Sequence, residues 1–161
     1  MDGRIFSYPP IADASARILV LGTMPSVESL RQGFYYAHPR NAFWRIMAEI
    51  FGENVPATVE EKKSLLLRNG IALWDTLRSC EREGSLDSAI QRPEPNDIPA
   101  LLAECPDIRK ICFNGAASEM LFMRHIGPVE GVELIRLPST SPAYTLAYAK
   151  KLAVWKAAIG G

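Results

Sequence analysis

The sequence predicts an α/β fold of three layers, in which helices cover both faces of a central, mostly parallel four-stranded sheet. Four short, mostly apolar runs have the length of strands, and segments with helical character separate them. Because strands and helices alternate along the chain, βαβ units with parallel strands are favoured. A length of 161 residues suits one globular core, so we expect residues 1–161 to form a single domain.

The run Arg17–Gly22 is rich in branched aliphatic residues and ends at a glycine, which is typical of a strand buried on both faces. We expect strands at Arg17–Gly22, Ile71–Trp74, Arg109–Phe113 and Val132–Leu137. Glycine or polar residues follow each of these runs. In parallel sheets ligands bind beyond the carboxyl ends of the strands, so these following residues are the candidate site.

Apolar residues recur every three or four positions from Asn41 to Phe51, which predicts a helix. A second helix is expected at Val59–Arg68, with Thr58 as its cap and acidic residues in its first turn. Further helices are expected at Asp97–Glu104, at Ala116–His125, and from about Thr145 to Ile159. The final helix carries three lysines that we interpret as solvating charge: Lys150, Lys151 and Lys156.

The stretch Ser79–Pro99 is polar, charged and proline-bearing, without a convincing period. It predicts a long surface loop that contains at most one short helical turn. Loops of that length are usually functional or mobile.

Composition and charge narrow the function classes. The formal net charge is zero and the pI is near 6.7, so contact with phosphate requires a local basic patch.

The opening MDGRIFSYPP lacks the apolar region of a secretory signal, and no apolar run is long enough to cross a bilayer. We therefore expect a soluble, cytoplasmic protein without membrane contact. The cysteines and histidines are too scattered for a metal site, and no cofactor is expected.

Four blocks, in order, carry a resemblance that covers most of the chain. They are LGTMPSVESLRQGFYYAHPRNAFWRI at Leu21–Ile46, LWDTLRSCEREGSLDSAI at Leu73–Ile90, FNGAAS at Phe113–Ser118 and LPSTSPA at Leu137–Ala143. They resemble the uracil-DNA glycosylase superfamily, particularly its mismatch-specific uracil and hypoxanthine-DNA glycosylase groups. The resemblance implies a monomeric, metal-free hydrolase of base excision repair, acting on DNA with deaminated bases, hypoxanthine first and uracil or xanthine second.

Such an enzyme flips the damaged nucleotide into a pocket and reads its base by stacking and hydrogen bonds. The resemblance places Tyr36 at the stacking position, although Tyr35 is the alternative and one of the two is expected to pack inward. A donor and an acceptor on one amide suit Asn114 to the edge of hypoxanthine or uracil. The expected base-binding set is Gly22, Thr23, Met24, Pro25, Tyr36, His38 and Asn114.

Asn41 and Asp75 are the expected catalytic residues. Asn41 matches the asparagine of the hypoxanthine group, and its carbonyl suits it to orient the attacking water. The alternative is an N-cap, because asparagine before an apolar helix is a favoured capping residue. Asp75 is expected at the rim of the crevice, where it aids the water or stabilises the sugar cation; a cap or turn aspartate is the alternative.

The last block supplies hydroxyl and backbone N–H groups suited to phosphate. The expected DNA-binding residues are Ser26, Pro138, Ser139, Thr140 and Ser141, with a plain turn as the alternative. Mismatch uracil glycosylases carry a leucine wedge and an arginine where this chain has Ser141 and Ala143, which implies a preference for single-stranded or mismatched DNA. Met24 replaces a polar residue of other branches, so a non-catalytic nucleic-acid or nucleobase binder of the same fold is the alternative function.

Overall fold

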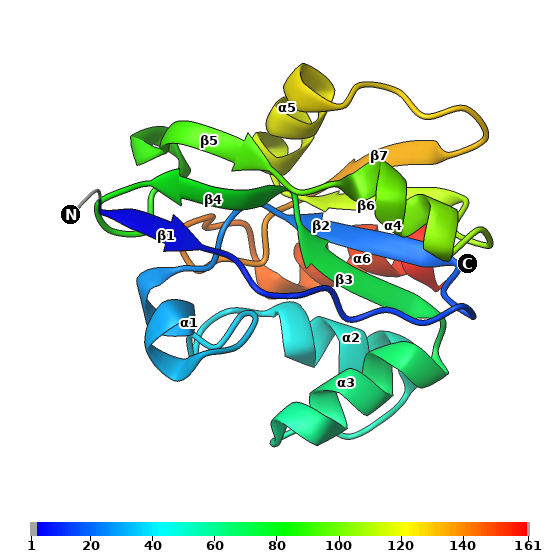
Figure 1. Cartoon of the computed structure of the whole chain (residues 1–161). Helices are drawn as coiled ribbons and strands as arrows, with labels where there is room; N and C mark the ends of the chain where they lie inside the picture. The colour runs from blue at the N-terminus through cyan, green and yellow to red at the C-terminus, as the bar shows by residue number, and fades with distance from the viewer. Residues whose placement is uncertain (1–2, 161) are drawn as a thin grey trace.

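The computed structural model describes residues 3–160, and a parallel sheet forms its centre. The strand order is β3-β2-β6-β7, and every neighbouring pair is parallel (Figure 1). The predicted four-stranded sheet is confirmed, with each strand within one residue of its expected ends. The strands are β2 (Ile18–Gly22), β3 (Ile71–Asp75), β6 (Lys110–Asn114) and β7 (Glu133–Leu137).

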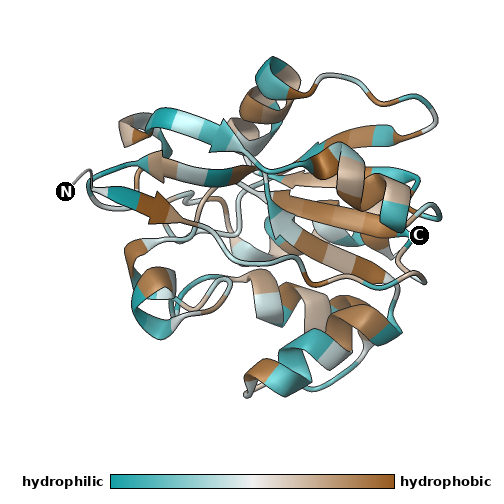
Figure 2. Ribbon diagram, viewed as in Figure 1, coloured by the Kyte–Doolittle hydropathy of each residue, from teal (hydrophilic) through white to brown (hydrophobic). Residues whose placement is uncertain are grey.

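Helices cover both faces of this sheet, as the three-layer prediction requires. Residues of β2 alternate between the two cores: Val20 packs with α2, α3 and α6, whereas Leu19 and Leu21 pack with α4 and α5. Figure 2 shows the central strands predominantly hydrophobic between these layers. The helices are α2 (Phe43–Phe51), α3 (Val59–Arg68), α4 (Ile98–Glu104), α5 (Ala116–His125) and α6 (Tyr148–Ile159).

Local capping explains where several helices begin. The Thr58 hydroxyl accepts from the Glu61 N–H at 3.1 Å, which confirms the predicted cap of α3. Asp97 caps α4 in the same way. The final helix begins at Tyr148 rather than Thr145, because the chain first makes a turn in which the Tyr144 N–H donates to the Ser141 carbonyl.

The prediction of a long loop over Ser79–Pro99 is wrong. The segment supplies the end of β4 and all of β5 to a second, antiparallel sheet of order β1-β4-β5. Of its structure, the sequence predicted only the short helical turn. Strand β5 lies at an edge and is mostly exposed, so charged residues and prolines replace the alternating apolar pattern. The elements are β1 (Arg4–Phe6), β4 (Leu77–Glu81), the 3₁₀ turn η1 (Asp87–Ala89) and β5 (Gln91–Pro95).

One further short helix, α1 (Val27–Gln32), follows β2 and was not predicted. The Ser26 hydroxyl accepts from the Ser29 N–H at 3.1 Å, and Gly33 ends the helix in the left-handed conformation. Ser26 is therefore a helix cap at the mouth of the crevice beyond β2. Across residues 3–160, no helix is both long and apolar enough to span a bilayer.

Candidate active site

A cavity of about 420 Å³ opens at the carboxyl ends of the central strands, within the size range of small-molecule sites. It lies where the sequence places the candidate site, because the segments after β2, β3, β6 and β7 all contribute to its wall. The cavity brings together every predicted site residue except Pro138. Those lining it are Gly22, Thr23, Met24, Pro25, Ser26, Tyr36, His38, Asn41, Asp75, Asn114, Ser139, Thr140 and Ser141.

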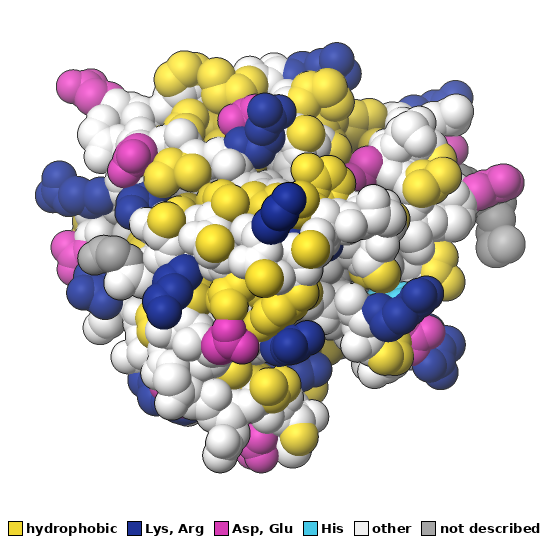
Figure 3. Space-filling model, turned by 180° about the vertical axis from the view of Figure 1, so that it is seen from behind, with side chains coloured by type: hydrophobic (Ala, Val, Ile, Leu, Met, Phe, Trp, Pro, Cys, Tyr) yellow, Lys and Arg dark blue, Asp and Glu magenta, His cyan; other side chains and the backbone are white. Residues whose placement is uncertain are grey.

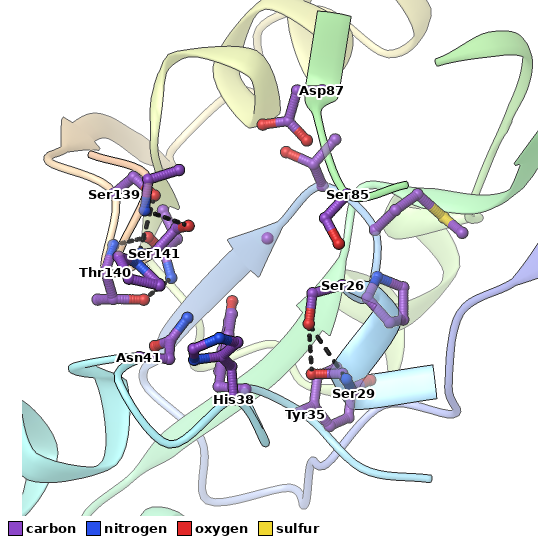
Figure 4. A pocket seen from close by; sticks show the side chains of 18 of the residues that line it. Ser26, Ser29, Tyr35, His38, Asn41, Ser85, Asp87, Ser139, Thr140 and Ser141 are labelled. Atoms are coloured by element: carbon purple, nitrogen blue, oxygen red, sulfur yellow. Dashed lines mark hydrogen bonds between the residues drawn. The ribbon is translucent and has the colours of Figure 1, made fainter. Parts of the chain in front are cut away.

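Figure 4 shows how the side chains surround this cavity. Ser139, Thr140 and Ser141 lie on one side, facing Ser26 and Ser29 across the opening. His38 and Asn41 lie between these two groups, and Ser85 and Asp87 lie opposite them. The cavity also has lining residues that the sequence did not predict: Ser29, Tyr35, Arg40, Ser85, Asp87, Pro142 and Ala143.

The floor of the cavity consists of Gly22, Asp75 and the Tyr36 hydroxyl. A Cβ atom on Gly22 would lie 2.5 Å from Asp75 Oδ1 and 2.6 Å from the Tyr36 hydroxyl oxygen, so only glycine fits. Among the described residues, neither Asp75 Oδ2 nor the Tyr36 hydroxyl has a well-formed hydrogen bond, although both atoms are buried. Two buried polar groups without partners at the base of a cavity are typical of a functional site.

Asp75 is only 2% exposed, so its expected position at the rim is wrong. Strand β3 carries it inward at its last residue, and β4 follows almost directly, so it caps no helix. Burial raises the pKa of Asp75 to about 7, and the negative charge of Asp87 adds to that rise. Burial and the Asp75 charge likewise raise the pKa of Tyr36, which the neighbouring Asn114 amide only partly opposes.

The two adjacent tyrosines have different environments. Tyr35 is 3% exposed, and its hydroxyl donates to the Pro9 carbonyl at 2.7 Å. Tyr36 remains partly exposed at the cavity, with its ring centroid 4.4 Å from that of Phe43. Tyr36 has a φ of 52°, a left-handed backbone conformation that is unusual outside glycine. Tyr35 is thus the tyrosine that packs inward, and Tyr36 is the one with ring surface available to a ligand.

Asn41 forms a cap-like contact and lines the cavity at the same time. Its Oδ1 accepts from the Phe43 N–H at 2.9 Å, while the formal N-cap of α2 is Ala42, which has no capping group. One lone pair of Oδ1 and the amide hydrogens remain for a ligand. The nearby His38 accepts from the Arg40 N–H at Nδ1, so the neutral ring carries its proton on Nε2.

Asn114 and Thr140 are joined by two buried hydrogen bonds. Asn114 Nδ2 donates to the Thr140 hydroxyl at 2.9 Å, and the Thr140 N–H donates to Asn114 Oδ1 at 2.9 Å. These contacts fix the end of β6 against the loop after β7. One lone pair and one amide hydrogen of Asn114 form no further hydrogen bond found among residues 3–160, although the amide lies next to the Tyr36 hydroxyl, and both are open to a ligand.

Residues behind the cavity hold the loop after β7 in place. The Pro138 carbonyl accepts from Trp155 Nε1 at 2.8 Å, which explains why Pro138 packs away from the cavity. Lys151 Nζ donates to the Ser141 carbonyl at 3.1 Å and is only 4% exposed. The interpretation of Lys151 as solvating charge is therefore wrong, since its ammonium group supports the loop from inside.

The link between β4 and β5 closes the side of the cavity opposite Asn41. Arg82 donates to the Pro25 carbonyl, and the Val27 N–H donates to the Ser85 hydroxyl at 2.9 Å. These bonds bring Asp87 to the cavity as a second carboxylate beside Asp75. Asp87 keeps solvent access, but neighbouring protein atoms raise its pKa and Arg82 opposes that rise.

No three side chains of His, Cys, Asp or Glu lie close enough together within residues 3–160 to hold a metal ion. The described part of the cavity therefore offers polar side chains for binding and catalysis. They are two carboxylates, two amides, a histidine and several hydroxyls around an aromatic ring. Such a set can stack a planar ring, hydrogen-bond its edge and position a water molecule.

Comparison with known proteins identifies the family. Residues 9–159 match the uracil DNA glycosylase superfamily. A hypoxanthine DNA glycosylase of Methanosarcina acetivorans is 41% identical over 143 residues, which cover 84% of this chain and 85% of that protein. A hypoxanthine DNA glycosylase of Methanosarcina barkeri is 37% identical over 112 residues, 69% of this chain and 71% of that protein.

A solved structure agrees with this assignment. The solution NMR structure of a candidate uracil DNA glycosylase from Methanosarcina acetivorans superposes with a TM-score of 0.84 at 36% sequence identity. The match covers 98% of this chain and 97% of the other. Together with the match over nearly the whole sequence, this shows that the chain belongs to the uracil DNA glycosylase superfamily, whose members hydrolyse the N-glycosidic bond of a base in DNA.

Proposed function

We propose that this enzyme removes hypoxanthine from DNA, with uracil and xanthine as lesser substrates, and that Asn41 positions the attacking water. The observation that carries the proposal is the shared cavity of Asn41, Tyr36 and Asn114 at the carboxyl edge of the sheet. Two relatives of substantial identity and coverage that are named hypoxanthine DNA glycosylases support the choice of base.

Base binding in this proposal uses the groups that remain unpaired. The flipped base stacks on the Tyr36 ring, since Tyr35 is packed inward and has little surface to offer. Such stacking contributes about 1–3 kcal/mol. The free amide hydrogen and lone pair of Asn114 then face the edge of hypoxanthine, which presents both an acceptor and a donor.

Bond cleavage places positive charge on the sugar and negative charge on the departing base. The second lone pair of Asn41 Oδ1 accepts a hydrogen bond from the attacking water, while its bond to the Phe43 N–H holds the amide in one orientation. The water oxygen bonds to the anomeric carbon as the bond to the base breaks, and the proton that the water loses passes through solvent to the departing base. The Asp75 carboxylate, when ionised, favours the sugar cation electrostatically, and buried charges act strongly because water screens them little.

The decisive experiment measures base release from oligonucleotides that carry hypoxanthine, uracil or xanthine, single- and double-stranded. The wild type is compared with Asn41→Ala, Asn41→Asp and the exposed control Arg124→Ala, which lies on α5 outside the cavity lining. We expect hypoxanthine to be released fastest and Asn41→Ala to reduce release by about 100-fold or more, in the range of a lost positioned catalytic group. Circular dichroism checks that each variant is folded.

Two results would contradict the proposal. Wild-type protein that binds DNA but releases none of the three bases would favour the non-catalytic binder. The observation that supports this alternative is the apolar Met24 in the cavity wall. Release that persists unchanged in folded Asn41→Ala would reject the assigned role of Asn41 while leaving the activity itself in place.

A further inference from the structure

A second hollow of about 710 Å³ lies directly beside the base cavity. Both hollows are lined by Tyr36, His38, Arg40, Asn41 and Pro142, so they are immediate neighbours. We call the second one the flanking groove. The side chains that characterise it are Arg40, Arg45, Lys62, Lys151, Tyr144 and Tyr148.

The flanking groove concentrates positive charge in a chain whose formal net charge is zero. Four cationic side chains line it, and no aspartate or glutamate does. None of these cations takes part in the ion pairs found among residues 3–160. Figure 3 shows Lys and Arg scattered over the face seen from behind. With four lining cations and no lining carboxylate, the flanking groove meets the sequence-based requirement for a local basic patch.

Tyr144 projects from the wall of the groove and is 49% exposed. Its N–H donates to the Ser141 carbonyl, the same oxygen that accepts from buried Lys151. Lys151 Nζ also lies 5.5 Å from the centre of the Tyr144 ring. The turn and the lysine together fix the direction of an aromatic face that the protein leaves uncovered.

Two of the other three cations, Arg45 and Lys62, are likewise positioned by aromatic rings. The Arg45 guanidinium lies 3.7 Å above the ring of Tyr148, and Lys62 Nζ lies 5.5 Å from the ring of Trp44. Glu49 contacts the Tyr148 hydroxyl at 3.4 Å but does not line the groove. Positive charge interleaved with aromatic surface is the pattern that binds single-stranded nucleic acid.

We propose that the flanking groove binds the unpaired DNA segment next to the flipped nucleotide. Tyr144 stacks on the neighbouring base, and Arg40, Arg45 and Lys62 contact its phosphates. An unpaired strand fits because only an unstacked base exposes its face to Tyr144, and the residues just before Tyr144, Ser141 and Ala143, are small. This inference rests on the proposed function, since the base cavity sets the direction of the strand.

The test measures binding of an undamaged, fluorescently labelled single-stranded oligonucleotide by anisotropy, over a range of salt concentrations. We expect Tyr144→Ala to weaken binding by about 5- to 100-fold, which corresponds to the loss of one stacked base, and Tyr144→Phe to retain wild-type affinity. The pair Arg45→Ala and Lys62→Ala should lower the slope of log affinity against log salt by about 1.4, or roughly 0.7 for each phosphate that the protein no longer neutralises.

The matched control is the pair Lys63→Ala and Lys150→Ala. Both lysines are exposed and lie outside the groove lining, on α3 and α6, and this pair should leave the slope unchanged. An equal decrease of the salt slope in the groove pair and in the control pair would overturn the proposal. So would a Tyr144→Ala variant that weakens binding to duplex DNA but not to the single strand. The binding test uses undamaged DNA, from which no base is removed, so its result does not depend on catalysis. A failure to release damaged bases would therefore reject the proposed function and leave the binding result unchanged.

Discussion

Gly22 illustrates how closely the floor of the base cavity is packed. A side chain there meets Asp75 and the Tyr36 hydroxyl well inside contact distance. We expect Gly22→Ala to lower the free energy of unfolding by about 1–3 kcal/mol, the usual cost of overpacking, and to reduce base release. Urea denaturation measures the first effect.

A coupled set of variants checks the cause of the Gly22 effect. In the background of Asp75→Ala with Tyr36→Phe, both atoms that Gly22→Ala would meet are gone. The same glycine substitution should then cost clearly less, because contacting residues give non-additive effects. An unchanged cost in that background would show that the backbone, rather than the two side chains, requires glycine.

Asp75 makes stability depend on pH. Its pKa of about 7 in the folded protein lies above its ordinary value of 3.8, so the folded state holds this proton more tightly than the unfolded chain. Its stabilising contribution is full below pH 3.8 and is lost as pH rises through 7, for a total of about 4 kcal/mol. Asp75→Asn should remove this decline, and denaturation measured from about pH 4 to about pH 9 compares the two proteins.

The same titration governs the proposed electrostatic role of Asp75. If the carboxylate stabilises the sugar cation, base release by the wild type rises as pH passes through about 7. Asp75→Asn should lack this rise and be slower above it. A wild-type rate that is flat through neutral pH in folded protein would argue against an ionised Asp75 in the reaction.

At the scale of elements, the loops after β6 and β7 act as one unit because Asn114 and Thr140 bind each other. Thr140→Val keeps the shape but leaves the buried Asn114 Nδ2 without its acceptor. We expect a loss of about 1–3 kcal/mol in the free energy of unfolding together with slower base release. Thr140→Ser, which retains the hydroxyl, is the control; equal losses in both variants would mean that the methyl group matters more than the bond.

Elements with a strong hydrophobic pattern were predictable from the sequence. The four central strands are short, mostly apolar runs, and the residues that follow them meet in one cavity because parallel strands end at the same edge. The cap residue Thr58 predicted the start of helix α3, and its hydroxyl accepts a hydrogen bond from the Glu61 N–H, as a cap does.

Elements that depend on distant contacts were not predictable. Strand β5 has the sequence QRPEP and lies exposed at an edge, so it shows no alternation. Asp87 reaches the cavity only because Arg82 and Ser85 bind the segment around Pro25 and Val27. Lys151 looks like an ordinary surface lysine until the fold places the Ser141 carbonyl against it. Each of these depends on a partner far away in the sequence.

At the scale of the whole molecule, a small apolar cluster packs the β1-β4-β5 sheet against α5 and the loop after β2. Met24 of the cavity wall packs there with Leu77, Cys80 and Leu121, and Ile5 of β1 packs against them. Ile5→Ala should destabilise the protein by about 2 kcal/mol or less, since the side chain is only partly buried, and should weaken substrate binding through Met24. Phe6→Ala is the control, because its ring is 54% exposed on the same strand; similar KM values for both variants would contradict the link.

The opposite positions of the chain's two ends have a practical consequence for handling the enzyme (Figure 1). Strand β1 braces the sheet that forms one wall of the cavity, whereas α6 ends where Lys110 Nζ donates to the Ala158 carbonyl, at the amino-terminal edge of β6. A tether at the carboxyl end therefore leaves open the side of the molecule that carries the cavity. Attachment to a bead, a sensor chip or a second enzyme belongs at that end, where a bulky neighbour and an incoming strand do not compete for the same space.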